Sequence, residues 1–270
     1  MRSTTLSLLA LASLLTACPT GGGEDPLPTP DFVGDSDLNV YLFAHFDATE
    51  PLEMQQGVEA LEESLAAVNL TGDQADRRWD MTAPLTPDDY GGANIWEGAD
   101  PLDQIIVSVA GRSAHDVTDL GGLIPIADQT PFESASSVEY NRTVVGDGDA
   151  FVAQTIDVLE TENEVHRQNF ILNVWYDTPK FFRWIELSDG RKALVARAWL
   201  EQAYEGENGT NSLEQFTAME VRIPDANGTV LYTTVWGFLR PSIGDTVLAN
   251  SVANGIDEGW ENTEAHLDAN

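Results

Sequence analysis

The sequence is poor in cysteine and in basic residues. Cys18 is the only cysteine among the 270 residues, so the chain alone can close no disulfide and cannot build a cysteine-rich metal site. Lysine and arginine together number 13, against 45 aspartate and glutamate residues, and the formal net charge is −32 at pH 7. Proteins bind nucleic acids through basic residues that displace counterions from phosphates, so this composition excludes a nucleic-acid partner. It also excludes electrostatic attraction to anionic lipids.

Sequence motifs of catalysis and metal binding are absent as well. The chain has no Gly-x-Ser-x-Gly elbow, no phosphate-binding loop and no His-Glu-x-x-His pair. The acidic segments at 35–39 and 147–149 are not followed by the sixth-position glycine and the twelfth-position glutamate of a calcium loop. We therefore predict no catalytic residue, no metal site and no cofactor. Enzymatic activity is the less favoured alternative, and Arg183 and His166 would then be the first candidates.

The first seventeen residues have the three-part layout of a secretory signal. Arg2 supplies a positive charge, an apolar stretch runs from Leu6 to Leu15, and the small residues Thr16 and Ala17 follow. Ten apolar residues in a helix rise only about 15 Å, roughly half the thickness of a bilayer core, which is too short for a stable span. We predict that residues 1–17 are a signal peptide that is removed.

The segment Leu15-Thr16-Ala17-Cys18 resembles the lipobox of bacterial lipoproteins, in which the cysteine takes the lipid. The resemblance implies a lipoprotein of the bacterial cell envelope, carrying palmitate or a similar acyl chain on Cys18 and held to the membrane through it. In the family pattern an aspartate after the cysteine favours the inner membrane. Pro19 stands there instead, so the outer membrane, on its periplasmic side, is the expected location. The alternative is a chance cysteine beside an ordinary signal.

Residues 18–37 are rich in glycine, proline and acid, and we expect them to form a flexible tether. The rest of the chain can form a substantial core, since 42% of the sequence is hydrophobic and there are seven tryptophans. We predict a single α+β domain over 38–270, with its core at 105–268. The acidic residues are spread evenly, as on a solvated surface, and a salty habitat would screen their mutual repulsion.

The N-terminal part of this domain contains two periodic segments. Residues 38–46 are apolar on both parities, which predicts a strand covered on both faces, with His45 as a core or edge residue. An amphipathic helix follows, with apolar residues at steps of four and three: Met54, Val58, Leu61, Leu65 and Val68. Residues 71–101 lack a clear period and are expected to form a long ordered loop.

From Ile105 onward the sequence predicts a curved antiparallel sheet of six or more strands. A strand at Ile105–Ala110 precedes a short helix from Ser113, as N-cap, to Leu120. Period-two runs then predict strands at Val138–Val145, Phe151–Leu159, Asn169–Tyr176, Phe181–Leu187, Lys192–Leu200, Phe216–Ile223 and Thr229–Phe238. Turn residues separate the strands, at 146–149, Asp177-Thr178-Pro179, Asp189-Gly190, Asn208-Gly209 and Asn227-Gly228.

A last helix is predicted from Ser242 to Leu267, packed across the sheet. Its apolar face carries Leu248, Val252, Ile256, Trp260 and Leu267. Gly255 and Gly259 lie four residues apart in this helix. They either allow it to approach a strand closely or leave room beneath it for a ligand.

The hairpin at 181–200 is apolar on both faces. A two-residue turn at Asp189-Gly190 places Arg183 opposite Ala196, among apolar neighbours. It places Arg197 across from Phe182, at a distance suited to a cation–π contact. The face of Arg197 also carries Trp184, Val195 and Trp199. Apolar groups must therefore cover each face, either terminal helices or an internal cavity. Arg183 either pairs with a buried carboxylate or turns toward an anionic ligand group.

The order of strand, short helix, antiparallel strands and one long helix resembles the START-like helix-grip fold, with Trp236-Gly237-Phe238-Leu239-Arg240-Pro241 as a local echo. The resemblance implies a cavity for lipids or other apolar molecules between the sheet and the C-terminal helix. The residues expected to bind such a ligand are Arg183, Arg197, Trp184, Trp199, Trp236 and Trp260. The half-barrel of periplasmic lipoprotein carriers is a second possible fold. A structural or protein-interaction envelope lipoprotein without a small-molecule ligand is the alternative function.

Overall fold

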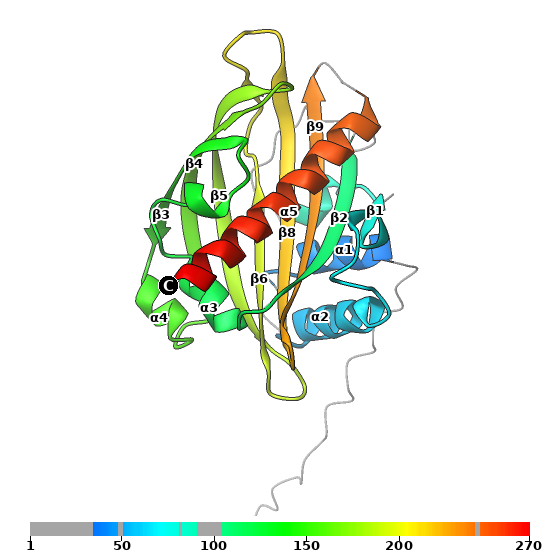
Figure 1. Cartoon of the computed structure of the whole chain (residues 1–270), viewed down its shortest axis with the longest axis vertical. Helices are drawn as coiled ribbons and strands as arrows, with labels where there is room; N and C mark the ends of the chain where they lie inside the picture. The colour runs from blue at the N-terminus through cyan, green and yellow to red at the C-terminus, as the bar shows by residue number, and fades with distance from the viewer. Residues whose placement is uncertain (1–34, 48–50, 81–82, 91–103, 241–243) are drawn as a thin grey trace, which may run out of the picture.

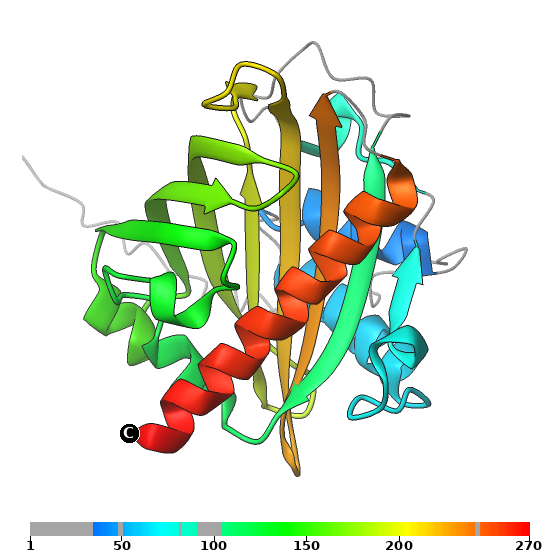
Figure 2. The ribbon, with the colours of Figure 1, turned by 45° about the horizontal axis from the view of Figure 1, so that its top comes forward.

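The computed structural model describes residues 35–47, 51–80, 83–90, 104–240 and 244–270. The predicted signal, Cys18 and most of the predicted tether lie outside the described residues. Across the described part, nine antiparallel strands form one curved sheet, and a long C-terminal helix lies over one face of it (Figures 1 and 2). The predicted fold class is therefore confirmed.

The strands pair in the order β1-β2-β9-β8-β6-β5-β4-β3, and β7 pairs with β8. Their bounds are β1 Arg78–Asp80, β2 Ile105–Ser113, β3 Ser137–Val145, β4 Val158–Gln168, β5 Asn173–Glu186, β6 Lys192–Trp199, β7 Tyr204–Glu205, β8 Ser212–Asp225 and β9 Gly228–Arg240. Every pairing is antiparallel. Neighbours in sequence are mostly neighbours in the sheet, as the predicted succession of hairpins requires.

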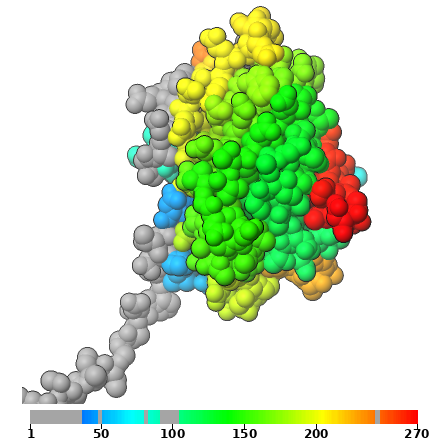
Figure 3. Space-filling view, turned by 90° about the vertical axis from the view of Figure 1, so that its left-hand side faces the viewer, coloured from blue at the N-terminus to red at the C-terminus, as the bar shows by residue number. Residues whose placement is uncertain are grey.

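Helices cover both faces of the sheet. The longest, α5 (Asp245–Ala269), runs diagonally across one face, and α1 (Asp35–Ala44) and α2 (Pro51–Leu65) lie behind the other (Figure 1). A view onto the β3 edge shows the end of α5 on one side of the sheet and the N-terminal helices on the other (Figure 3). The short helix α3 (Val117–Gly122) contacts β6 and β8, and α4 (Gly148–Val152) contacts α3 and β4. None of the helices described is both long and apolar enough to cross a membrane.

The segment predicted as a doubly covered strand, residues 38–46, is helical instead and forms most of α1. Its buried apolar side chains are Leu38, Leu42, Phe43 and Phe46. An apolar run of nine residues suits a buried helix as well as a buried strand, and its periodicity does not separate the two. The ring of His45 contacts the Tyr41 carbonyl oxygen 2.9 Å away. The helix begins at Asp35, inside the predicted tether.

Residues 151–159, predicted as a strand, instead end α4 and begin β4. Asp147 starts the helix as its N-cap, because its carboxylate accepts a 2.9 Å hydrogen bond from the N–H of Ala150. Beyond Val158, the strand β4 continues to Gln168 through a segment that is mostly polar. Two of its inward side chains are polar yet buried, Thr161 and Asn163. An apolar alternation therefore could not mark this strand.

The strands predicted at 169–176 and 181–187 are one strand, β5, and the predicted turn at Asp177-Thr178-Pro179 is wrong. The ladder from β5 to β6 starts only at Lys180. Pro179 thus sits at the margin of that ladder, where a missing N–H is tolerated. The Thr178 hydroxyl donates to the Trp199 carbonyl oxygen at 2.9 Å just there.

The β5–β6 hairpin is confirmed, but its predicted register is off by one residue. The N–H of Leu187 donates to the carbonyl oxygen of Arg191 at 2.8 Å, and Gly190 has φ of 83°. The loop therefore holds one residue more than the predicted turn. Arg183 pairs with Val195, and Arg197 pairs with Phe181 rather than with Phe182. Because a one-residue slip exchanges faces, Arg183, Arg197 and Trp199 share one face and Trp184 lies on the other.

The remaining predicted elements are present with shifted ends. The strand predicted at Ile105–Ala110 is β2, and β3, β8 and β9 contain the segments predicted for them, whereas α2, β6 and α5 contain most of theirs. The helix predicted to be capped by Ser113 starts later, after Asp116, and the Ser113 hydroxyl accepts a hydrogen bond from the N–H of His115 instead. The predicted loop at 71–101 contains β1, which pairs with β2. Residues 81–82 and 91–103 lie outside the described residues.

Candidate functional site

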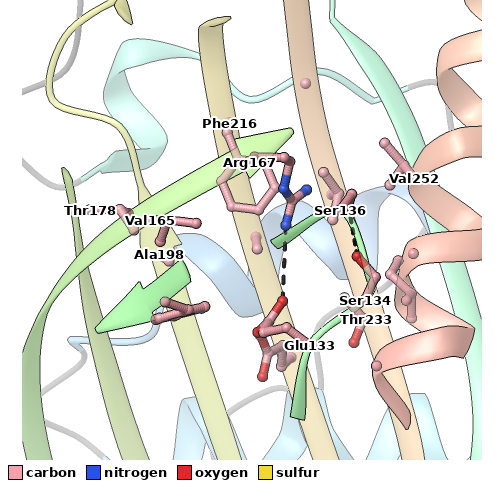
Figure 4. A pocket seen from close by; sticks show the side chains of 18 of the residues that line it. Glu133, Ser134, Ser136, Val165, Arg167, Thr178, Ala198, Phe216, Thr233 and Val252 are labelled. Atoms are coloured by element: carbon pink, nitrogen blue, oxygen red, sulfur yellow. Dashed lines mark hydrogen bonds and ion pairs between the residues drawn. The ribbon is translucent and has the colours of Figure 1, made fainter. Parts of the chain in front are cut away.

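A cavity of about 230 Å³ lies between the sheet and α5. Its walls come from β3, β4, β5, β6, β8 and β9, from the segment around α3, and from the inner face of α5. Side chains from these elements converge on one space in Figure 4. The sequence analysis expected either terminal helices or an internal cavity to cover the apolar faces of the sheet. The structure has both, because α1 and α2 cover one face and a cavity under α5 occupies part of the other.

Small side chains make the floor of the cavity. Ala198 of β6 lies directly opposite Ala218 of β8, and both line the cavity. On either side of them in the same row of the sheet stand Lys180 of β5 and Val235 of β9. A larger residue at either alanine would occupy the cavity, so the cavity exists because these two central positions are small.

The inner face of α5 forms the roof. Leu248, Val252, Ile256 and Trp260, which the sequence places on one helix face, all line the cavity. Gly255 and Gly259 line it too, and they bring α5 close to the loop after Phe132 rather than to a strand. A Cβ on Gly259 would lie 3.3 Å from the Phe132 carbonyl oxygen. The glycines therefore allow a close approach of α5, although the neighbour is this loop and not the predicted strand, and room for a ligand stays a prediction.

One glycine of the sheet positions the aromatic residue of this roof. Gly111 lies in β2, and a Cβ built on it would stand 2.5 Å from Cζ3 of the Trp260 ring. No side chain fits between this strand and the indole. Gly111 therefore allows Trp260 to lie flat against the sheet at the edge of the cavity.

A charged cluster projects into the cavity from the sheet. The Lys180 ammonium donates to the Glu220 carboxylate at 2.5 Å, and Arg222 reaches the other oxygen of Glu220 at 3.4 Å. Burial raises the pKa of Glu220, but the attraction of Lys180 and Arg222 outweighs it, so the pKa lies below its ordinary value. Burial lowers the pKa of Lys180, and Glu220 opposes that shift. The Glu220 carboxylate is therefore the shared partner of Lys180 and Arg222.

Arg142 stands beside this cluster and bonds neutral groups. Its guanidinium donates to Asn163 Oδ1 at 2.8 Å, to the Ile124 carbonyl oxygen at 3.0 Å and to the Tyr140 hydroxyl at 3.1 Å. It also lies over the ring of Phe182, 5.2 Å from the centroid. No carboxylate of the described residues forms an ion pair with Arg142.

Arg167 of β4 points into the middle of the cavity (Figure 4). Its Nη2 lies 3.9 Å from a Glu133 carboxylate oxygen and donates to the Ser137 hydroxyl at 3.3 Å. Its guanidinium carbon lies 5.9 Å from the centre of the Phe216 ring. Its Nε is buried and has no hydrogen-bond partner among the described residues. Burial raises the pKa of nearby Tyr176 to about 12 despite this cation, so that hydroxyl is neutral at physiological pH.

Of the six residues predicted to bind a ligand, Trp260 lines the cavity and the other five do not. Trp184 is on the same side of the sheet, but its Nε1 donates to the Phe151 carbonyl oxygen at 2.9 Å and the ring packs beneath α3 and α4. The indole is thus part of the hydrophobic cluster beneath α3 and α4. Trp184 therefore packs behind the wall of the cavity and does not line it.

The other four residues lie on the opposite face, beneath α1 and α2. The Arg183 guanidinium donates to the Phe46 carbonyl oxygen. Arg197 forms an ion pair with Asp47 and lies 4.7 Å from the centre of the Phe46 ring. Trp199 and Trp236 are buried in the same core. The structure thus joins Arg183 and Arg197 to the residues that follow α1.

Sequence reasoning missed the charged residues of the cavity, which are Arg142, Arg167, Lys180, Glu220 and Arg222. One available signal was parity, because Lys180 alternates with Phe182 along β5 and Glu220 alternates with Ala218 along β8. Their convergence depends on the order β5-β6-β8, which places a third strand between them. That order could not be established from the sequence.

No protein-family model and no curated protein sequence matches the chain. Solved structures of similar fold include a STAR-related lipid transfer protein fragment from Xanthomonas axonopodis. It is 13% identical over 64% of this chain and 89% of that chain, with a TM-score of 0.41. Human StAR-related lipid transfer protein 5 is 8% identical over 81% of this chain and 97% of that chain, with a TM-score of 0.42. Similarity at this level concerns the fold alone and carries no argument about function.

Proposed function

We propose that the protein binds a small hydrophobic ligand in the cavity between the sheet and α5. The observation that supports this most directly is the cavity, which has a floor of alanines and a roof formed by the apolar face of α5. Concave sites of this kind, largely apolar with a few convergent polar groups, are the usual places for small-molecule binding. Of the six residues predicted from the sequence, Trp260 is the one that we propose contacts the ligand.

The volume limits the size of the ligand. Pockets that hold drug-sized molecules run from roughly 300 to 1,000 Å³, and this cavity measures about 230 Å³. A two-chain lipid would have to widen it considerably. A single short acyl chain or a molecule of comparable size is therefore the ligand that we propose.

The alternative function is a structural or interaction protein whose sheet faces are simply covered. The arrangement of α5 favours ligand binding over that alternative. Its apolar side chains Leu248, Val252 and Ile256 border an unfilled space between the helix and the sheet. A purely structural helix gains from filling such a space, since each buried methylene contributes about 0.8 kcal/mol.

The ligand proposal is tested by organic extraction and mass spectrometry of the protein purified from its own cells. We expect a small apolar molecule in stoichiometric amount from the wild type. The matched control is Ala198→Phe, which fills the cavity from its floor and should carry much less of the same molecule. The absence of any co-purifying molecule, together with no binding of short fatty acids or alcohols added to the protein, would contradict the proposal.

We also propose that the protein works as a lipoprotein anchored to the outer membrane through Cys18. The support is the lipobox-like sequence Leu15-Thr16-Ala17-Cys18, which lies outside the described residues. Acyl chains would supply the anchoring energy, because the charge of the protein opposes contact with anionic lipids. Cells grown with labelled palmitate should label the wild type but not Cys18→Ser. Equal labelling of both proteins would refute the anchor.

A further inference from the structure

We propose that the ligand is an anionic amphiphile, with a carboxylate or phosphate headgroup held by Arg167, in a cavity lined by further cations, and an apolar tail under α5. The inference rests on the proposed function and adds the chemical class of the ligand. It draws on three independent observations: the charge census of the cavity, the unused donor of Arg167, and the separation of polar from apolar walls.

The cavity concentrates positive charge in a strongly negative protein. The chain has 13 basic and 45 acidic residues. Among the described residues, four basic ones line the cavity but only two acidic ones do, which leaves a local surplus of two positive charges. The basic residues are Arg142, Arg167, Lys180 and Arg222, and the acidic residues are Glu133 and Glu220. If the cavity lining had the same proportion of basic and acidic residues as the whole chain, its net charge would be negative.

The ion pairs within the cavity do not absorb this surplus. Lys180 and Arg222 share the single carboxylate of Glu220, and within the described part of the chain Arg142 donates only to neutral acceptors. Glu133 is 3.9 Å from Arg167, at the limit of an ion pair. Charges taken out of water are costly unless they are paired. A ligand anion would supply the pairing that the described residues do not provide.

Arg167 has the geometry of an anion receptor. Its Nε is buried without a hydrogen-bond partner in the described part of the chain. The planar guanidinium offers parallel N–H groups that match the two oxygens of a carboxylate or a phosphate. Figure 4 shows this side chain reaching from β4 into the space between Phe216 and Glu133. An anion there would satisfy the free donor and oppose the local surplus of charge.

The walls also separate polar from apolar chemistry. The four basic residues and Glu220 project from the strands β3, β4, β5 and β8, whereas α5 contributes an apolar face with Leu248, Val252 and Ile256. A small free anion would use only the first wall, and a hydrocarbon only the second. An amphiphile uses both, and its headgroup must be anionic because the fixed charges are predominantly positive.

The test compares matched probes by calorimetric titration of the full chain carrying Cys18→Ser, which removes the proposed lipid site. The probes are decanoate, decyl phosphate, decanol, and acetate and inorganic phosphate alone. Decanoate or decyl phosphate should bind about tenfold or more tightly than decanol, as expected when a charge-assisted pair is gained. Acetate and inorganic phosphate should bind far more weakly, because they lack the tail.

Two variants assign the effect to the cavity. Arg167→Gln should reduce the preference of the protein for decanoate over decanol to near unity while decanol affinity stays constant. Its control is Arg240→Gln, since Arg240 is exposed and does not line the cavity. Lys180→Met should lower decanoate affinity, whereas Lys192→Met, at the only other lysine, should not. Circular dichroism establishes that each variant is folded, and Arg167→Gln decides the test if Lys180→Met fails to fold.

The outcomes separate this inference from the proposed function. Equal binding of decanol and decanoate, or an unchanged preference in Arg167→Gln, would overturn the anionic headgroup and leave a hydrophobic ligand in place. Binding of acetate or phosphate as tight as that of decanoate would overturn the amphiphile. If no probe bound, both proposals would fail together.

Discussion

Glu220 is the residue on which the charges of the cavity depend. It accepts from Lys180 and faces Arg222, while Arg167 and Arg142 stand nearby with little or no carboxylate of their own. Each of these side chains enters the cavity from a different strand or a different position along it. The pairing register of the strands therefore determines which charged groups meet in the cavity. A single substitution removes one of these groups, so its effect can be assigned to that group.

The pH dependence of stability should reveal the Glu220 pair. Its pKa in the folded protein lies below the ordinary value of 4.5, so its contribution to stability is complete above about pH 4.5 and is lost as the pH falls through the folded value. Glu220→Gln has no such contribution to lose. Urea unfolding at about pH 6 and about pH 3.5 should therefore show a larger loss for the wild type than for Glu220→Gln. Parallel losses would contradict the pairing.

Gly111 should be required for the position of Trp260. Gly111→Ala places a methyl group 2.5 Å from the indole, and overpacking of this kind costs roughly 1–3 kcal/mol. We expect a lower free energy of unfolding together with weaker ligand binding, because the displaced ring enters the cavity. Gly122→Ala is the control, since a Cβ there meets nothing within 4 Å. An unchanged affinity in Gly111→Ala would refute a role for Trp260 in the cavity wall.

At the residue scale, sequence reasoning identified Trp260 and missed the cations. Trp260 was predictable because it lies on the apolar face of one helix, and helical periodicity is local. Arg183 and Arg197 were expected to face a ligand, but they lie under α1 because the segment expected as a strand is a helix above them. Arg167 lies within the run 160–168, in which Val165 is the only apolar residue, so the sequence gives little indication of which side chains point inward. Only the pairing of β4 with β5 defines its direction.

At the element scale, α1 and α2 form a layer that is separate from the cavity. Phe43 is fully buried there, with its ring 5.0 Å from that of Tyr90 and 5.9 Å from that of Trp236. None of these three rings lines the cavity. The two faces of the sheet therefore have different roles. The face under α1 and α2 forms part of the hydrophobic core, and the face under α5 encloses the cavity.

Phe43→Ala should separate these roles. Removal of a buried phenylalanine costs roughly 3–5 kcal/mol, so the free energy of unfolding should fall by that amount. The affinity for decanoate in the folded protein should stay constant, because the sheet lies between Phe43 and the cavity. Phe170→Ala, at a side chain that is 87% exposed, should change stability by less than about 0.5 kcal/mol. A loss of affinity in Phe43→Ala would show that the faces are coupled.

Strands and helices with a clear period were predictable, and those that depend on tertiary contacts were not. The central strands β6, β8 and β9 and the helices α2 and α5 follow from alternation or from a helical stripe. The helix α1 is apolar on several sides because it is buried, which imitates a strand. The strand β4 carries Thr161 and Asn163 inward, and their burial is possible because Asn163 bonds Arg142 and the backbone of β5. The hydrogen-bond partners that make the burial of these polar side chains possible lie on neighbouring strands, so the sequence of β4 alone does not reveal them.

At the scale of the whole molecule, the excess of acid governs stability through self-repulsion. A net charge of −32 opposes the compact state, and salt screens that repulsion. The unfolding temperature should therefore rise when sodium chloride increases from about 0.1 M to about 1 M. Differential scanning calorimetry measures it directly. A constant or falling unfolding temperature would contradict this account and the salty habitat that it suggests.

The central claim is that the space beneath α5 holds the tail of an acid whose headgroup lies at Arg167. A crystal structure with 10-bromodecanoate tests it most directly, because the bromine marks the end of the tail by its anomalous signal. We predict a bromine peak beside Val252 and Ile256 under α5, with the carboxylate within hydrogen-bond distance of the Arg167 guanidinium. A bromine peak on the α1 and α2 face, or a carboxylate turned away from Arg167, would contradict it.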